Sequence, residues 1–333
     1  MPRVRPRAPG VGLALACGLG IALAAAGCGD SPLAPPRLLG ILTPIGDSGV
    51  EVRIQDQGIL DRDASTMWYD QYSITAPDLG PEDDQGVPLV EVNGQLYYHP
   101  VKIAQRGLRF LWTFGQTGDS TYLDYAYRFA ARLRAMANVS SDGARFYPYP
   151  FDFDLHHRSS ERMKAPWYSG MAEGQALSFF VRLYRLTGDP SYRQAADSTF
   201  ATFLTPKTPE GHPDRFVAHV DSTGYYWVDE FPMVRQNNDT LNGFIFGVFG
   251  LYEYWRLTGD SRARQLVLAS LTTLRAYLPA FRVAGEPSYY CLRHRVQDSK
   301  YHEVHIQELH QLALMSGDVY FQEMSDLFRR DQG

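Results

Sequence analysis

The chain has 333 residues, and 32 lysines and arginines against 37 aspartates and glutamates give it a net charge of −5. This acidic balance argues against general nucleic-acid binding, which requires a basic surface. A chain of this length buries roughly three quarters of its unfolded surface, so one hydrophobic core is enough to stabilise it without disulfides.

The N-terminus has the pattern of a secretory signal. Three arginines stand within the first seven residues, an apolar stretch runs from Val11 to Gly27, and Cys28 follows directly. This order is typical of a signal peptide, and the cysteine resembles the end of a bacterial lipobox. The alternatives are a plain signal peptide or a retained anchor helix, for which the run is short. We expect residues 1–27 to be the signal, Cys28 to carry lipid, and residues 28–37 to be a tether in a bacterial cell envelope (periplasm or outer surface).

Residues 38–92 lack helical periodicity and are predicted to form an irregular, β-rich lead-in. Gly49 to Ile54 alternates like a short strand, and Pro77 to Pro88 reads as a loop. From Val101 the apolar residues recur with helical spacing. We expect residues 93–330 to form one helical domain. The first helix is predicted to begin at Val101. The others are predicted to span about 122–136, 171–187, 191–204, 241–257, 261–278, 304–316 and 319–329.

A Thr/Ser-Gly-Asp motif recurs four times, each time after a helix-like apolar run. The glycines are Gly118, Gly188, Gly259 and Gly317, which are 70, 71 and 58 residues apart. Glycine ends one helix in a left-handed cap, and the aspartate caps the next helix. Each motif therefore marks the corner of an αα-hairpin. Repeated hairpins of this size predict an all-α fold, an (α/α) toroid or incomplete barrel whose inner helices line a central cleft.

Three amides lie near the starts of the predicted inner helices. They are Gln105, Gln175 and Asn242. Such amides either satisfy backbone groups of the loops or face a ligand at the mouth of the barrel.

The densest polar segment runs from residue 288 to residue 305 and contains Tyr290, Arg293 and Tyr301. A zinc site is one interpretation, but His302 and His305 are three apart, whereas the zincin motif needs a spacing of four, and we expect no metal. Acid–base chemistry on an acidic sugar is the sharper hypothesis, because arginine pairs with carboxylates and a phenol is a competent proton donor. The alternative is that these tyrosines are half-buried residues at the rim of a cleft, whose hydroxyls only form hydrogen bonds with the backbone.

Two further segments combine acids with aromatic residues. Tyr168, Glu173 and Gln175 lie around the start of a predicted helix, and Glu230 stands in an aromatic stretch. Glu173 and Glu230 are candidates for a glycosidase acid/base pair, by analogy with other toroids alone.

Six motifs in these regions resemble the C-terminal domain of the D-glucuronyl C5-epimerases, in the right order and spacing over about residues 97–325. They are Tyr98-His99-Pro100-Val101-Lys102-Ile103-Ala104-Gln105-Arg106-Gly107-Leu108, Trp167-Tyr168-Ser169-Gly170-Met171-Ala172-Glu173-Gly174-Gln175-Ala176, Asp229-Glu230-Phe231-Pro232, Leu241-Asn242-Gly243-Phe244, Tyr290-Cys291-Leu292-Arg293-His294 and Tyr301-His302-Glu303-Val304-His305-Ile306. Several of the matches fall in predicted loops, where packing alone does not impose them.

The resemblance implies an (α/α) barrel that removes the C5 proton of a uronic acid within a polysaccharide and returns it from the opposite face. Tyr290 and Tyr301 match catalytic tyrosines, Glu230 matches a functional acid, and Arg293 would hold the substrate carboxylate. No cofactor is needed if that carboxylate accepts the charge. The other substrate-binding candidates are Tyr98, Gln105, Tyr168, Gln175, Asn242, His294, His302 and His305.

The chain departs from the family pattern at Phe231, where the family has a tyrosine, and only roughly sixty residues separate the signal from the barrel. A lyase or hydrolase in the same cleft, or a non-catalytic glycan-binding lipoprotein, is therefore kept as an alternative to the epimerase. The expected partners are an acidic polysaccharide and, through Cys28, the membrane, with a homodimer as a further candidate. Without residues 1–27 the charge becomes 29 − 37 = −8, which again indicates no nucleic-acid partner.

Overall fold

The computed structural model describes residues 38–63, 73–74 and 80–332. The predicted signal, the lipidation site Cys28, the tether and part of the predicted 77–88 loop lie outside these residues. Within them, no helix is both long and apolar enough to cross a membrane.

Four helical hairpins build the described structure. The paired helices are α1 (Pro100–Thr117) with α2 (Ser120–Met136), α3 (Gly170–Thr187) with α4 (Pro190–Phe200), α5 (Leu241–Thr258) with α6 (Ser261–Phe281), and α7 (Ser299–Ser316) with α8 (Val319–Asp331). At the first corner Gly118 has φ 70°, its N–H donates to the Phe114 carbonyl, and the Asp119 carboxylate accepts from the Thr121 N–H. The other three corners repeat this geometry. The predicted hairpin corners are confirmed.

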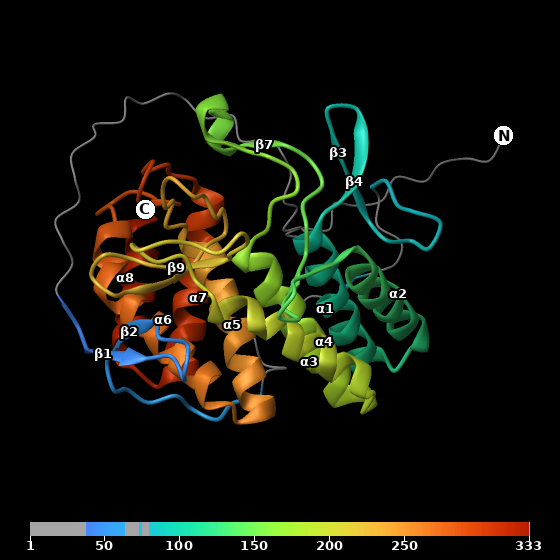
Figure 1. The fold of residues 1–333 in the computed structure, drawn as a ribbon, viewed down its shortest axis with the longest axis horizontal. Helices are drawn as coiled ribbons and strands as arrows, with labels where there is room; N and C mark the ends of the chain where they lie inside the picture. Colours follow the sequence, from blue (N-terminus) through green and yellow to red (C-terminus); the bar gives the residue numbers. More distant parts are fainter. Residues whose placement is uncertain (1–37, 64–72, 75–79, 333) are drawn as a thin grey trace.

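The odd-numbered helices stand side by side as an inner row, from α1 at one end through α3 and α5 to α7 at the other, with the even-numbered helices packed outside (Figure 1). α5 is buried along almost its whole length, as expected of a helix that is apolar all round. The row of hairpins is an incomplete (α/α) toroid, so the predicted all-α fold class is confirmed.

Glycines bring the two central inner helices into backbone contact. A Cβ added at Gly174 of α3 would lie 2.5 Å from the Gly247 Cα of α5, and one at Gly250 would meet the Gly174 backbone. Side chains at these positions would force the helices apart, so the sequence fixes their close approach.

Short antiparallel hairpins connect and cover the helices. They are β1 (Ile41–Pro44) with β2 (Glu51–Ile54), β3 (Leu89–Val92) with β4 (Gln95–Tyr98), β5 (Asn138–Val139) with β6 (Arg145–Phe146), β7 (Phe153–Asp154) with β8 (Arg162–Met163), and β9 (Ala218–Val220) with β10 (Tyr226–Val228). The β1–β2 hairpin packs on α6. The β3–β4 hairpin and the β7 segment lie at the end of the molecule where the inner helices begin (Figure 1).

Two helix boundaries differ from the predicted ones by four or more residues. α7 begins at Ser299 rather than at residue 304, because Asp298 caps it by accepting from the Lys300 N–H. The α-helical part of α4 ends at Phe200, and a 3₁₀ turn continues from Ala201 to Leu204. The polar first turn of α7 concealed the helical pattern there.

Candidate functional site

A cavity of about 450 Å³ opens at the N-terminal ends of the inner helices. Seven aromatic rings form a large part of its wall. The rings that line it are Tyr149, Phe151, Phe153, Trp167, Phe231, Tyr290 and Tyr301. Tyr149 and Trp167 stack with their ring centroids 3.8 Å apart and form a flat aromatic surface. A pocket with this lining suits the apolar face of a sugar ring, with a few polar groups left to orient it.

The predicted tyrosines and acid converge in this cavity. The Tyr290 hydroxyl donates to Oε2 of Glu230 at 3.0 Å, and the rings of Tyr290 and Tyr301 lie 4.6 Å apart, centroid to centroid. Burial raises the pKa of Glu230 to about 8, although the hydrogen bond from Tyr290 acts in the opposite direction. The site therefore holds a carboxyl group that exchanges protons near neutral pH and is linked directly to a phenol.

Glu230 is positioned by the β9–β10 hairpin. β10 ends one residue before Asp229, whose carboxylate accepts from Nδ1 of His219 on β9 at 2.9 and 3.0 Å. The Asp229 carbonyl also accepts from the Gly170 N–H at the start of α3, at 2.6 Å. On the other side, a Cβ at Gly243 of α5 would lie 2.5 Å from Oε2 of Glu230. Glu230 thus sits between a fixed turn and the first turn of α5.

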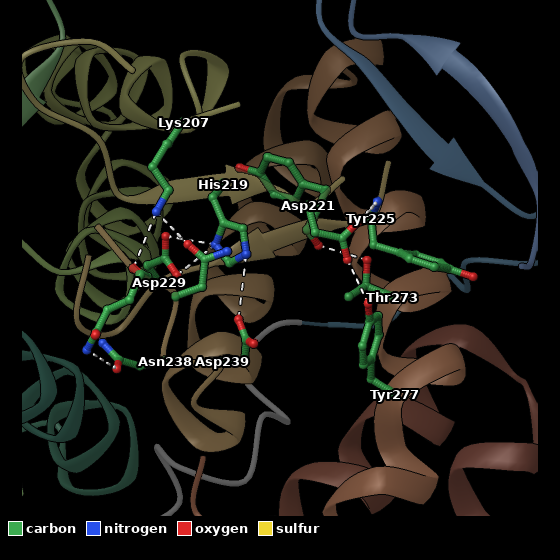
Figure 2. Close-up of polar contacts among 12 residues, drawn as sticks. Lys207, His219, Asp221, Tyr225, Asp229, Asn238, Asp239, Thr273 and Tyr277 are labelled. Atoms are coloured by element: carbon green, nitrogen blue, oxygen red, sulfur yellow. Dashed lines mark hydrogen bonds and ion pairs between the residues drawn. The ribbon is translucent and has the colours of Figure 1, made fainter. Parts of the chain in front are cut away.

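A buried charge cluster supports that turn (Figure 2). Lys207 donates to the carbonyls of Met233 and Gln236 at 2.8 and 3.3 Å, which ties down the segment after Glu230. Nε2 of His219 lies 3.6 Å from Oδ1 of Asp239. Burial disfavours the charged imidazole, but Asp229 and Asp239 outweigh it and raise the pKa of His219.

His302 and His305 lie on α7 behind the tyrosines and do not line the cavity in the described structure. Nδ1 of His302 accepts from the Ser288 N–H at 2.9 Å, so its Nε2 carries the proton that it donates to the Phe328 carbonyl at 2.8 Å. Nδ1 of His305 meets Oγ of Ser288 at 2.8 Å, and burial lowers its pKa to about 3. These contacts fix the segment that carries Tyr290 against α7 and α8.

The predicted amides lie deeper among the inner helices. Gln105, Gln175 and Asn242 are all buried. Both polar atoms of Gln175 and Oδ1 of Asn242 lack a hydrogen-bond partner among the described residues. Glu308 of α7 is fully buried as well, and burial together with the nearby Glu230 raises its pKa well above the usual range. A set of buried polar groups therefore lies below the cavity.

Several other predicted residues lie away from the cavity wall. The Tyr98 hydroxyl donates to Asp83 at 2.9 Å, and the Tyr168 hydroxyl accepts from Asn138 at 2.8 Å. Glu173 is fully buried, accepts from the Tyr147 N–H at 2.9 Å, and is not brought to the cavity beside Glu230.

Arg293 does not join Tyr290 and Tyr301 in the cavity lining. Its Nε lies 3.8 Å from Oε1 of Glu161, and its side chain is 45% exposed. The guanidinium that does line the cavity belongs to Arg162, which forms a two-point pair with Asp154 at 2.6 and 2.8 Å. The neighbouring His294 is buried, with Nε2 3.0 Å from Oε1 of Glu161.

Tyr149, Arg162, His99 and His156 line the cavity but were not among the proposed site residues, although His99 stands in one of the matched motifs. The 145–153 segment alternates aromatic residues with prolines and aspartates, and this is the one signal that pointed to an aromatic wall. Nothing local indicated that His156 would lie beside Tyr290, with ring centroids 5.8 Å apart.

The hairpin row and its cavity define an (α/α)-toroid protein with an aromatic, acid-bearing pocket. Residues 141–330, which are 190 of the 333 residues, match the profile described as the D-glucuronyl C5-epimerase C-terminus. The chain belongs to this family, as its motifs predicted.

Individual relatives are distant. The D-glucuronyl C5-epimerase of Caenorhabditis elegans is 24% identical over 179 residues, which cover 48% of this chain and 28% of that protein. An uncharacterised protein of Methanocaldococcus jannaschii is 27% identical over 170 residues and covers 50% of both chains. The match thus spans half or less of each curated relative.

Solved structures of similar shape include a GH76 α-mannanase of Bacteroides thetaiotaomicron, with a TM-score of 0.46, 10% identity, and coverage of 69% of this chain and 56% of that one. An unsaturated glucuronyl hydrolase of Streptococcus agalactiae has a TM-score of 0.45, 14% identity, and coverage of 69% and 56%.

Proposed function

We propose that this protein is a C5-epimerase of uronic acid residues within a polysaccharide, of the glucuronate-to-iduronate type. The observation that carries the proposal is the Tyr290–Glu230 hydrogen bond in the aromatic cavity, with Tyr301 beside it. Family membership supports it, because Tyr290, Tyr301 and Glu230 all fall within the matched residues.

The raised pKa of Glu230 explains how a phenol can act as a base here. The pKa of an ordinary phenol, about 10, is roughly six units above that of an ordinary glutamate, so proton transfer from the phenol to the carboxylate is strongly unfavourable. With the pKa of Glu230 at about 8, the gap narrows by 3.5 units, which is on the order of 5 kcal/mol of barrier. The Tyr290 proton moves to Glu230 while the phenolate oxygen removes the C5 proton.

The reaction also needs positive potential near the substrate carboxylate, because negative charge develops there when the C5 proton leaves. Ser169 is buried at the cavity wall directly before α3, and its side chain does not cap that helix. The N-terminus of α3 carries the positive end of the helix dipole. Arg162 lines the same cavity, and Arg293 is exposed beside Glu161. We propose that one of these guanidinium groups binds the carboxylate together with the α3 terminus.

A lyase is the second candidate, and one observation favours it. The two phenols lie side by side, whereas epimerisation requires proton-handling groups on both faces of the sugar, and Phe231 offers no hydroxyl. If no group serves the opposite face, removal of the C5 proton is followed by loss of the C4 substituent. That reaction produces a 4,5-unsaturated uronate.

One assay distinguishes these outcomes. Uronan polymers that contain glucuronate are incubated with the protein in deuterated water, with Tyr290→Phe as control. Deuterium at C5 with inverted configuration supports the epimerase, and ultraviolet absorbance from an unsaturated product supports the lyase. A folded protein that binds a uronan without exchange or elimination would overturn the proton-abstraction mechanism.

We further propose that the substrate is met in the bacterial cell envelope, where a lipid on Cys28 would hold the protein at a membrane. The lipobox-like end of the N-terminal apolar stretch supports this. Cys28→Ser should move the protein from the detergent phase to the aqueous phase in a Triton X-114 partition of expressing cells. Unchanged partition would contradict lipidation.

A further inference from the structure

Two imidazoles and a thiol meet beside the cavity. Nε2 of His156 lies 3.4 Å from Sγ of Cys291, and Nδ1 of His294 lies 3.5 Å from the same sulfur. All three atoms lie within 4.8 Å of one another. Cys291 and His294 are buried, whereas His156 is half-buried and also lines the cavity. The segments that carry them are more than 130 residues apart in the sequence.

The separations match those around a tetrahedral metal ion. With metal–nitrogen and metal–sulfur distances of about 2.0 and 2.3 Å, neighbouring ligand atoms lie about 3.3–3.5 Å apart. The two nitrogen–sulfur distances already have this value. The two ligand nitrogens lie within 4.8 Å of each other, so the half-buried His156 ring would have to move towards His294 to complete the tetrahedral arrangement.

A second residue orients one ligand for metal binding. Nε2 of His294 lies 2.8 Å from Oε2 of Glu161, and a carboxylate only accepts, so this nitrogen carries the proton. The lone pair of Nδ1 then faces the sulfur. A carboxylate that holds the far nitrogen of a histidine ligand is a recurrent feature of zinc sites.

The backbone also holds His156 in an unusual conformation. His156 has φ 50° and His157 has φ 59°, two successive non-glycine residues in the left-handed region. Each such residue costs about 1–3 kcal/mol and persists where the surroundings require it. Here the conformation brings the His156 ring to within 4.8 Å of the His294 ring, centroid to centroid.

We propose that His156, Cys291 and His294 form a binding site for a borderline-soft divalent metal ion of the zinc class. Two nitrogens and one sulfur favour such an ion over magnesium or calcium. Binding displaces the thiol proton to solvent and leaves the thiolate as ligand. Three protein ligands would leave a fourth position open. The sequence-level zinc candidates His302 and His305 take no part, since Ser288 and Phe328 occupy three of their four ring nitrogens.

The site would join two walls of the cavity. His156 follows β7, and Cys291 is the residue after Tyr290. A bound ion would therefore fix the position of the Tyr290 backbone relative to the β7 segment. The inference stands independently of the proposed function, because its test is metal binding.

The experiment uses the full chain, treated with a chelator and then titrated with Zn²⁺ against a chromophoric competitor, and separately with Co²⁺ to record the absorption spectrum. We expect one ion per chain, with a thiolate-to-cobalt charge-transfer band and the visible bands of tetrahedral cobalt. Cys291→Ser should abolish the charge-transfer band. His156→Asn should weaken Zn²⁺ binding at least tenfold, and it is the safer variant because asparagine tolerates the left-handed conformation. Glu161→Gln should weaken it about 10–100-fold.

Two matched controls replace groups of the same chemistry elsewhere. His310→Asn removes an exposed imidazole, and Cys28→Ser removes the other cysteine outside the signal. Both should bind Zn²⁺ like the wild type. Binding that survives Cys291→Ser and His156→Asn, or that is lost in Cys28→Ser, would overturn the proposal. Failure to bind Zn²⁺ stoichiometrically at micromolar concentration would show that the cluster is a thiol–imidazole hydrogen-bond network only.

Discussion

Replacing Glu230 by glutamine separates the shape of this side chain from its proton chemistry. Glutamine keeps the carbonyl oxygen that accepts from the Tyr290 hydroxyl but cannot take up its proton. General acid–base groups contribute about 10²–10⁴-fold to rate, so C5 exchange should fall by that factor while uronan affinity is retained. In the wild type the active form of Glu230 is deprotonated. Exchange should therefore rise with pH and level off above about 8, and it should lose this dependence in the variant.

The same variant tests the raised pKa through stability. The pKa of Glu230 in the folded protein, about 8, is above its ordinary value of 4.5. Its contribution to stability is therefore fully present below pH 4.5 and is lost as the pH rises towards 8. A shift of 3.5 units corresponds to an upper value of about 5 kcal/mol, and access of solvent to the cavity reduces this to roughly 2–4 kcal/mol. Glu230→Gln should thus become progressively more stable than the wild type from pH 4.5 to 8.

Urea unfolding at a series of pH values measures the difference. Glu210→Gln is the matched control, because Glu210 is exposed and far from the cavity lining. Its unfolding free energy should run parallel to that of the wild type. If Glu230→Gln also runs parallel across this pH range, Glu230 has no raised pKa and the proton relay through Tyr290 is wrong.

Three further changes test the supports of the site. Gly243→Ala places a Cβ 2.5 Å from Oε2 of Glu230, so C5 exchange should fall about tenfold or more with a loss of only about 1–3 kcal/mol in unfolding free energy. Gly174→Ala forces the α5 backbone away and should lose at least about 3 kcal/mol in urea unfolding, whereas Gly115→Ala, which meets nothing within 4 Å, should gain up to about 1 kcal/mol. Lys207→Met leaves two carbonyls without their ammonium donor and should lower stability by about 1–3 kcal/mol, and an unchanged midpoint would contradict its anchoring role.

The fold was predictable because its signals are local. In each Thr/Ser-Gly-Asp corner, the glycine forms the left-handed cap that ends one helix and the aspartate caps the N-terminus of the next. The two-residue strands between Asn138 and Met163 were not predictable, since strands this short leave no periodicity to detect. Their pairing depends on contacts with the helices on either side.

The candidate site was predictable where helical phase decides the outcome. Tyr301 lies in the first turn of α7 and lines the cavity as expected, whereas His305, about one turn further along the helix, contacts Ser288 instead. The direction of Arg293 was not predictable, because it depends on Glu161, which is 132 residues away. His156 was missed for the same reason, since its neighbour Cys291 is 135 residues away.

Two acids with raised pKa, Glu230 in the cavity wall and the buried Glu308, would let an acidic protein admit the proposed acidic substrate. Burying an unpaired charge is unfavourable, and both oxygens of Glu308 lack a hydrogen-bond partner among the described residues. Glu308 and Glu230 therefore hold their protons at neutral pH, since the pKa of each is raised by burial. Ionisation of one would also oppose ionisation of the other, because their charges interact. Glu230 and Glu308 then add no negative charge to the cavity, and the positive end of α3 remains to attract the carboxylate of the proposed uronate. Only the deprotonated fraction of Glu230, which grows as the pH approaches 8, can accept the Tyr290 proton in the proposed reaction.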